Sequence, residues 1–141
     1  MTALEFEGYH VDNMQYQRNL TYEATSKSDI KLNPEITVNN HINANHIDVT
    51  LSVLVGSTRD SKVPFEVTCT LTGSFTYHPE ADKDNVGPDS LVRNNAVAIL
   101  YPYIRTVVST LTMTSNEYPS YIMPTVDVSE VIDKQNGDRS K

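Results

Sequence analysis

The sequence has little of what the common chemistries of small proteins need. Its 141 residues include one cysteine, Cys69, five glycines and no tryptophan. A single cysteine excludes an intrachain disulfide and a multi-cysteine metal site. The glycines never cluster into a loop that could cradle phosphate. No apolar run approaches the roughly 18 residues that span a membrane, and the N-terminus lacks the pattern of a signal peptide, so we expect a cytoplasmic protein without membrane insertion.

Positive charge is also scarce. The chain has 11 Lys and Arg against 18 Asp and Glu. Residues 1–92 hold thirteen acidic and six basic side chains, whereas residues 93–141 hold five of each. Because there is no basic cluster and no tryptophan for base stacking, nucleic-acid binding is not expected. The acidic character suits solubility, and it also suits a partner with a basic face.

Few side chains are candidates for catalysis or metal binding. Cys69 falls on the inward phase of a strand pattern, so we interpret it as a buried structural thiol rather than a nucleophile. The other candidates are four histidines and two carboxylate pairs: His10, His41, His46, His78, Glu5/Glu7 and Asp82/Asp84. The histidines match no compact metal motif, and we interpret the carboxylates as solvated charge. We therefore expect no enzymatic activity, no metal and no cofactor.

Alternation of apolar and polar residues predicts a sheet. It is strict at residues 47–55 and 63–77, where one side of each strand faces a core and the other, rich in threonine, faces solvent. The short connector GSTRDSK predicts that these two strands form an antiparallel hairpin. Residues 4–24 alternate loosely and predict a long bulged strand or two short strands. Phase slips fall near Gly8, Asn13 and Arg18.

The clearest helix lies in the last third of the chain. Apolar residues recur there at the spacing of one helical face: Leu100, Ile104, Val107, Val108 and Leu111. We expect Asn94 or Asn95 to cap this helix, Pro102 to lie close to its first turn, and the helix to end near Asn116.

A second, shorter helix is predicted by the capping box Asp127-Val128-Ser129-Glu130 and ends near Asn136-Gly137. Strands followed by helices on one side of an antiparallel sheet make an α+β domain. We expect a single domain over residues 1–136 and a disordered tail at 137–141.

The segment between the two helices is unusually apolar for a loop. Residues 117–126 contain two tyrosines, two prolines, an isoleucine and a methionine: Tyr118, Tyr121, Pro119, Pro124, Ile122 and Met123. Aromatic side chains give large contact areas and methionine adapts to many shapes. This segment could fold back over the first helix as a lid, pack in an oligomer, or bind a ligand.

Three short motifs resemble a known family. They are ILYPYIR at 99–105, YPSYIMPTV at 118–126 and Gly73-Ser74-Phe75 on the last predicted strand. In this order they resemble the helix start, the crossover loop and the G-x-F motif of the SecB family of export chaperones. The resemblance extends over roughly residues 4–132. It implies a four-stranded antiparallel sheet followed by two helices on one face.

The resemblance also implies a function and an assembly. SecB-like proteins are ATP-independent holdases that bind unfolded or pre-secretory polypeptides in apolar grooves. The family assembles as a homotetramer built from two dimers, so for this chain we expect a homotetramer or a homodimer. By position, the client-binding residues would be Phe75, Tyr77, Tyr118, Tyr121, Ile122 and Met123. The oligomer interface would contain Val107, Val108 and Leu111, together with Cys69.

Two kinds of partner follow from the resemblance besides unfolded clients. Glu23 and Glu66 are candidates for docking the translocase motor SecA, although Asn19 and Thr68 stand where the family has acidic residues. The second helix is also shorter than in the family. Some SecB-like proteins instead serve one antitoxin of a toxin–antitoxin module. A non-chaperone interaction module is the remaining alternative.

Overall fold

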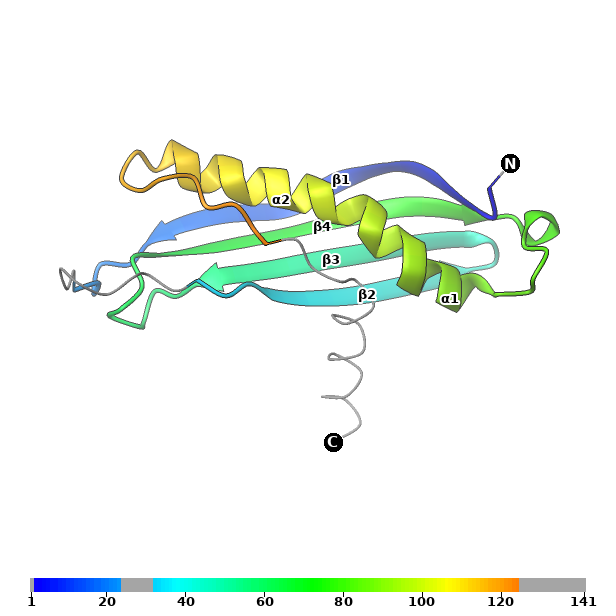
Figure 1. Ribbon diagram of the computed structural model, residues 1–141, viewed down its shortest axis with the longest axis horizontal. Helices are drawn as coiled ribbons and strands as arrows, with labels where there is room; N and C mark the ends of the chain where they lie inside the picture. Colours follow the sequence, from blue (N-terminus) through cyan, green and yellow to red (C-terminus); the bar gives the residue numbers. More distant parts are fainter. Residues whose placement is uncertain (1, 24–31, 125–141) are drawn as a thin grey trace, which may run out of the picture.

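The computed structural model describes residues 2–23 and 32–124, which form a four-stranded antiparallel sheet with helices on one face (Figure 1). The strands are β1 Leu4–Arg18, β2 Glu35–Asn43, β3 His46–Gly56 and β4 Phe65–Tyr77, in the spatial order β1-β4-β3-β2. The helical elements are the 3-10 turn η1 Pro79–Ala81, α1 Pro88–Leu91, the π-helical turn η2 Val92–Ala96, and α2 Val97–Thr114. The predicted α+β class is confirmed.

The β3–β4 hairpin is the centre of the sheet. The two strands pair in antiparallel register, with Leu51 opposite Leu71. Inward residues of both strands are buried, and their outward neighbours form a ladder in which Thr50 meets Thr72 at 3.0 Å. The alternation therefore gives the predicted arrangement, in which one side of the hairpin packs in the core and the other makes polar contacts.

Strand β1 is one long strand with two irregularities. Its register against β4 shifts between Phe6 and Gly8 and again between Val11 and Asn13. These are the predicted slips near Gly8 and Asn13, and Gly8 has a positive φ of 122° that suits a bulge. The third slip is not a bulge, because Arg18 is the last residue of the strand.

The long helix lies across the inner face of the sheet. It buries Leu100, Ile104 and Val108, as the spacing predicts, while Val107 and Leu111 are partly buried at the margin. Gly73 of β4 allows this close approach, because an added Cβ would lie 2.5 Å from Cδ2 of Leu100.

The start of the helix was predicted wrongly. Helical structure begins at Pro88 after Gly87 and runs through η2 into α2, so neither Asn94 nor Asn95 caps it. Pro102 consequently lies well inside the helix and not in its first turn. Proline is favoured at the first helical position, so Pro88 marks the start of the helix in the sequence. The apolar periodicity, which begins later, does not reveal this start. The predicted second helix and the tail at 137–141 lie outside the described residues.

Candidate functional site

After α2 the chain turns back along the helix (Figure 1). We call residues Glu117–Pro124 the return segment. The hydroxyl oxygens of Ser120 and of Ser109 on α2 lie 2.6 Å apart, within hydrogen-bond distance. The backbone N–H of Tyr121 donates to Oγ1 of Thr112 at 2.8 Å. The hydroxyl of Tyr101 donates to the carbonyl of Pro124. Of the three alternatives, the structure thus shows the fold-back over the first helix.

The side chains of the return segment point in different directions. Met123 is fully buried in the core cluster, and Tyr118 and Tyr121 are partly buried against it. Ile122 is 61% exposed. Burial lifts the pKa of the Tyr121 phenol, whose hydroxyl donates to the carbonyl of Leu32 at 3.1 Å. Of the four residues expected to contact a client from this segment, Ile122 is the one that is freely accessible.

Two residues expected to contact clients from β4 have structural contacts instead. Phe75 is fully buried, with its ring centroid 5.3 Å from that of Phe6. The hydroxyl of Tyr77 donates to Asp82 at 2.7 Å. Phe75 and Met123 therefore belong to the core in this conformation, and their contact with clients stays a prediction.

Asp82 also differs from its interpretation as solvated charge. Its carboxylate is buried and accepts hydrogen bonds from the backbone N–H groups of Gly87 and Val86, at 2.8 and 2.9 Å, besides that from Tyr77. The hydrogen bond from Gly87, followed by those from Tyr77 and Val86, lowers the pKa of Asp82. Asp82 thereby holds the loop between β4 and α1, as a carboxylate does when it accepts several N–H bonds.

A groove runs along the exposed side of α2. It has a volume of about 350 Å³ and lies between the helix and Ile122 of the return segment. Its walls combine apolar, hydroxyl and cationic side chains: Pro102, Arg105, Thr106, Ser109, Thr110 and Ile122. Such a mixture suits a peptide, with apolar contacts from Pro102 and Ile122 and hydrogen bonds from the hydroxyls.

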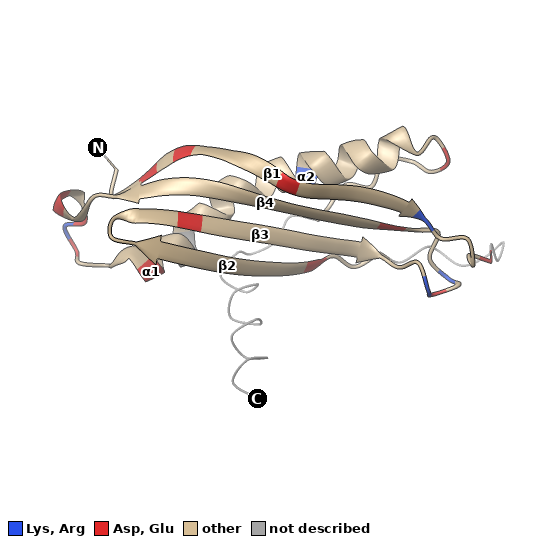
Figure 2. Ribbon diagram, turned by 180° about the vertical axis from the view of Figure 1, so that it is seen from behind, with Lys and Arg blue, Asp and Glu red and all other residues tan. Residues whose placement is uncertain are grey.

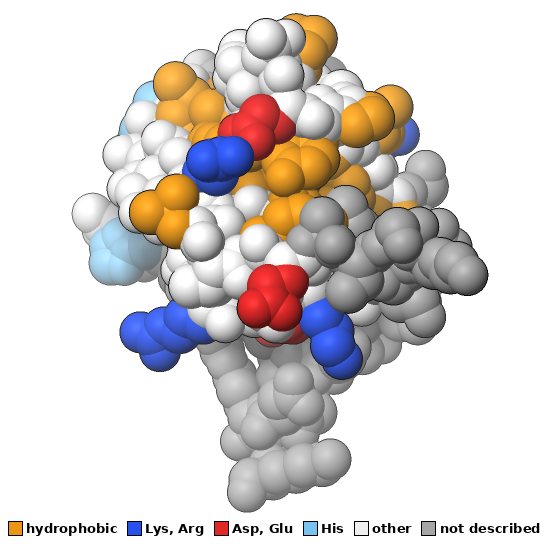
Figure 3. All heavy atoms as spheres, turned by 90° about the vertical axis from the view of Figure 1, so that its left-hand side faces the viewer, with side chains coloured by type: hydrophobic (Ala, Val, Ile, Leu, Met, Phe, Trp, Pro, Cys, Tyr) orange, Lys and Arg blue, Asp and Glu red, His pale blue; other side chains and the backbone are white. Residues whose placement is uncertain are grey.

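An aromatic cluster lies where the return segment leaves α2. The ring of Tyr118 is 5.7 Å from Phe65 and 6.5 Å from Tyr22, and the ring of Tyr16 is 5.4 Å from Phe65. The hydroxyl oxygen of Tyr16 is buried without a hydrogen-bond partner among the described residues. Figure 3 looks onto this end of the molecule, where apolar side chains gather beside a few charged ones.

The expected oligomer interface is largely covered within the protomer. Cys69 is 1% exposed and Val108 is fully buried, so neither side chain is available to a second copy. The interpretation of Cys69 as a buried thiol is confirmed, and burial raises its pKa to about 11. Val107 and Leu111 remain at the partly buried margin of the helix.

Sequence reasoning missed an exposed apolar strip on β1. Tyr9, Val11 and Met14 are 40%, 37% and 59% exposed, although they lie opposite inward residues of β4. Tyr103 of α2 stacks on Tyr9 with ring centroids 4.4 Å apart. The register places these residues on the helix side of the sheet, where α2 contacts Tyr9 through Tyr103 and leaves the strip partly exposed. The two phase slips were the signal that could have located them.

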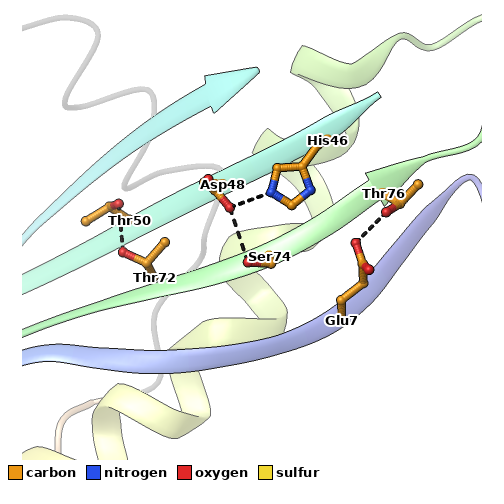
Figure 4. A network of polar contacts seen from close by, with 7 residues as sticks. All are labelled: Glu7, His46, Asp48, Thr50, Thr72, Ser74 and Thr76. Atoms are coloured by element: carbon orange, nitrogen blue, oxygen red, sulfur yellow. Dashed lines mark hydrogen bonds and ion pairs between the residues drawn. The ribbon is translucent and has the colours of Figure 1, made fainter. Parts of the chain in front are cut away.

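The outer face of the sheet is polar, and Figure 2 views the sheet from this side, with the acidic positions along the strands in red. On this face Asp48 accepts hydrogen bonds from Ser74 at 3.2 Å and contacts His46 at 3.0 Å, and Thr76 donates to Glu7 (Figure 4). Of the expected docking residues, Glu66 is partly exposed on β4.

Glu23 is exposed in the loop after β1, off the sheet face that carries Glu66. Asn19 is buried, and its amide donates to the carbonyls of Asp60 and Val63 at 2.8 and 2.7 Å. Asn19 therefore holds the β3–β4 loop and has no free surface for a partner.

Among residues 2–23 and 32–124, no helix is long and apolar enough to cross a bilayer. The same residues contain no group of three or more His, Cys, Asp or Glu placed to hold a metal ion.

Comparison with known proteins extends this description. A sequence model of the family described as preprotein translocase subunit SecB matches residues 9–138. The chain belongs to the SecB family. Within this family it resembles an uncharacterised protein of Methanocaldococcus jannaschii, with 30% identity over 132 residues that cover 90% of this chain and 81% of the other.

Two solved structures share the SecB-like fold. One is the SecB-like chaperone of Mycobacterium tuberculosis in complex with a ChAD peptide from the HigA1 antitoxin, with a TM-score of 0.66 at 15% identity, covering 88% of this chain and 91% of the other. The other is a protein of unknown function from Streptococcus agalactiae, with a TM-score of 0.50 at 16% identity, covering 86% and 97%. At these identities the likeness concerns the fold.

Proposed function

We propose that this SecB-family protein is an ATP-independent holdase chaperone that binds unfolded polypeptides along α2. The observation that carries the proposal is the groove between α2 and the return segment, with the exposed side chain of Ile122 over it. Membership of the SecB family supports a chaperone role without catalysis. The proposal places the protein in the cytoplasm, where newly made chains are unfolded.

The physical basis is burial of apolar surface without a fixed sequence. Each Å² of apolar area removed from water contributes about 25 cal/mol, so many different segments can bind to the same groove. Arg105 in the groove wall adds a cationic contact for acidic or backbone carbonyl groups of a client. The net charge of −7 keeps the chaperone itself dispersed.

Suppression of aggregation tests this function. We expect the protein to keep a chemically reduced, unfolded substrate in solution at near-stoichiometric ratio. Ile122→Ser should weaken the protection, whereas Leu20→Ser, which changes an 84% exposed leucine beyond the end of β1, should not. Equal protection by both variants would show that clients do not use the groove.

A dedicated antitoxin chaperone is the second candidate function. The observation that favours it is the structural neighbour from Mycobacterium tuberculosis, which is bound to a peptide from an antitoxin. A dedicated chaperone would bind one antitoxin segment far more tightly than unrelated unfolded chains. Titration with both kinds of peptide separates the two functions.

A further proposed partner is SecA, which would dock through Glu23 and Glu66. The two carboxylates lie on different elements, and Asn19 is occupied in holding the β3–β4 loop. Charge reversal at Glu66 tests this docking when SecA binding is measured. Unchanged binding would contradict this docking surface.

We also propose that the protein self-associates through β1. This strand of 15 residues is at the edge of the sheet and carries the exposed strip of Tyr9, Val11 and Met14. Long edge strands with apolar side chains are normally covered, because they otherwise pair with any available strand. A second copy would cover both strips, giving a homodimer, and the partly buried Val107 and Leu111 remain candidates for joining two dimers into a homotetramer.

A further inference from the structure

The return segment is attached to the molecule by side chains. Within residues 2–23 and 32–124, no backbone–backbone hydrogen bond joins it to another segment. Its anchors include the Ser109–Ser120 pair, the contact of Tyr121 with Thr112, and an ion pair of 2.8 Å between Arg18 and Glu117. Two tyrosine hydroxyls add to these: that of Tyr101 donates to the carbonyl of Pro124, and that of Tyr121 donates to the carbonyl of Leu32. Removing such a segment breaks no secondary structure, so its displacement is a local event rather than an unfolding of the sheet.

The return segment nevertheless covers apolar surface as a ligand would. Met123 is fully buried with the core residues of the sheet, and Tyr121 packs at its margin. Ile122 between them faces outward, which is the alternation of an extended peptide lying in a groove. Asn116, just before the segment, has a left-handed φ of 60°, so the chain direction changes sharply at this residue.

A buried polar atom remains unpaired beside the segment. Tyr16 and Tyr118 both pack against Phe65, and the Tyr16 hydroxyl has no partner within residues 2–23 and 32–124. Buried hydroxyls are normally paired, so the Tyr16 hydroxyl keeps capacity for a further hydrogen bond. A backbone carbonyl or N–H of an incoming chain supplies what this hydroxyl lacks.

We infer that the return segment is a displaceable strap, and that a client enters between it and α2. In the closed form the segment occupies the apolar surface itself, and Met123 and Tyr121 are withheld from clients. When the segment lifts, both side chains and the surface beneath them become the wall of a wider groove. This inference rests on the proposed holdase function and adds that client binding competes with the chain's own segment.

A reversible lock tests the inference. The hydroxyls of Ser109 and Ser120 lie 2.6 Å apart, so the double variant Ser109→Cys/Ser120→Cys can form a disulfide with little movement. The native Cys69 is buried and does not interfere. The probe is reduced, carboxymethylated α-lactalbumin, which stays unfolded and has no free thiol. Its binding is measured before and after addition of dithiothreitol, with wild type and Ser120→Cys, which lies outside the groove lining, as controls.

We expect the oxidised double variant to bind the probe at least about tenfold more weakly than the same protein after reduction. Equal affinity in both redox states overturns the strap and leaves the holdase function standing. If wild type and the reduced variant also fail to bind, the holdase function itself is contradicted.

A second variant covers the case in which the disulfide does not form. Ser109→Ala/Ser120→Ala removes the hydroxyl pair and weakens the closed form. If the segment competes with clients, this variant binds the probe several-fold more tightly than wild type. If the segment is a fixed wall, the variant binds equally or more weakly, and the inference is overturned.

Discussion

At the scale of single residues, the least expected finding is the number of polar side chains that have structural roles. Asp82 and Asn19 look like surface residues in the sequence, yet both are buried and hydrogen-bonded to backbone groups of loops. Periodicity cannot reveal such residues, because they lie in loops where no face is defined. Cys69 was predicted correctly because it lies in a strict strand alternation.

Asp82 predicts a specific response to acid. Because its pKa is lowered in the folded protein, its contribution to stability is present above the unfolded pKa near 4 and is lost as the pH falls through the folded pKa. Asp82→Asn should lower the urea midpoint at pH 7 and flatten its decline between about pH 5 and pH 3. The exposed neighbour gives the control: Asp84→Asn should follow wild type. Parallel acid profiles for wild type and Asp82→Asn would contradict this role.

Replacing Asn19 should lower the stability of the protein through lost hydrogen bonds to the β3–β4 loop. Asn19→Ala leaves the carbonyls of Asp60 and Val63 without their donor, at a cost of about 1–3 kcal/mol in the free energy of unfolding. Urea denaturation measures this cost, and the exposed Asn40→Ala is the matched control. A loss no larger than that of the control would show that the β3–β4 loop does not depend on Asn19.

At the scale of elements, alternation and helical spacing predicted the sheet face and the helix face, because both follow from burial on one side. The start of the helix was not predictable from the same signal. The π-helical turn Val92–Ala96 shifts the phase of the helix, so a pattern read from Leu100 onward does not extend back to Pro88. The direction of the return segment does not follow from the sequence, since its apolar residues fit a lid over the helix, an oligomer contact and a ligand site alike.

The contact between α2 and the sheet can be tested at Gly73. Gly73→Ala places a Cβ 2.5 Å from Cδ2 of Leu100 and should destabilise the protein by about 1–3 kcal/mol. The cost should shrink in a Leu100→Ala background, because the clash is then absent, although Leu100→Ala is itself destabilising. If the stability losses of the two substitutions are additive in the double-mutant cycle, the side chain of Leu100 does not pack closely against Gly73.

At the scale of the whole molecule, the proposed self-association depends on which apolar side chains one protomer leaves exposed. Val108 and Cys69 are covered within one protomer, whereas Tyr9 and Met14 on β1 are exposed. The register of β1 keeps these side chains on the helix side of the sheet, where α2 covers them only in part: Tyr103 stacks on Tyr9, and Met14 is 59% exposed.

Self-association through β1 predicts a change in mass. Wild type should elute as a dimer or tetramer in size-exclusion chromatography with light scattering, and Tyr9→Ser/Met14→Ser should shift it toward the monomer. Leu20→Ser and Met113→Ser change comparably exposed apolar residues elsewhere and should leave the mass unchanged. An unchanged mass for the β1 variant would place the interface on another surface.

The function proposed for this SecB-family chain is binding of unfolded polypeptide along α2 and the return segment. The most direct measurement is a calorimetric titration of reduced, carboxymethylated α-lactalbumin into wild type, Ile122→Ser and Leu20→Ser. We predict saturable binding by wild type and Leu20→Ser and weaker binding by Ile122→Ser. Absence of binding by wild type, or equal affinity for all three proteins, would contradict the claim.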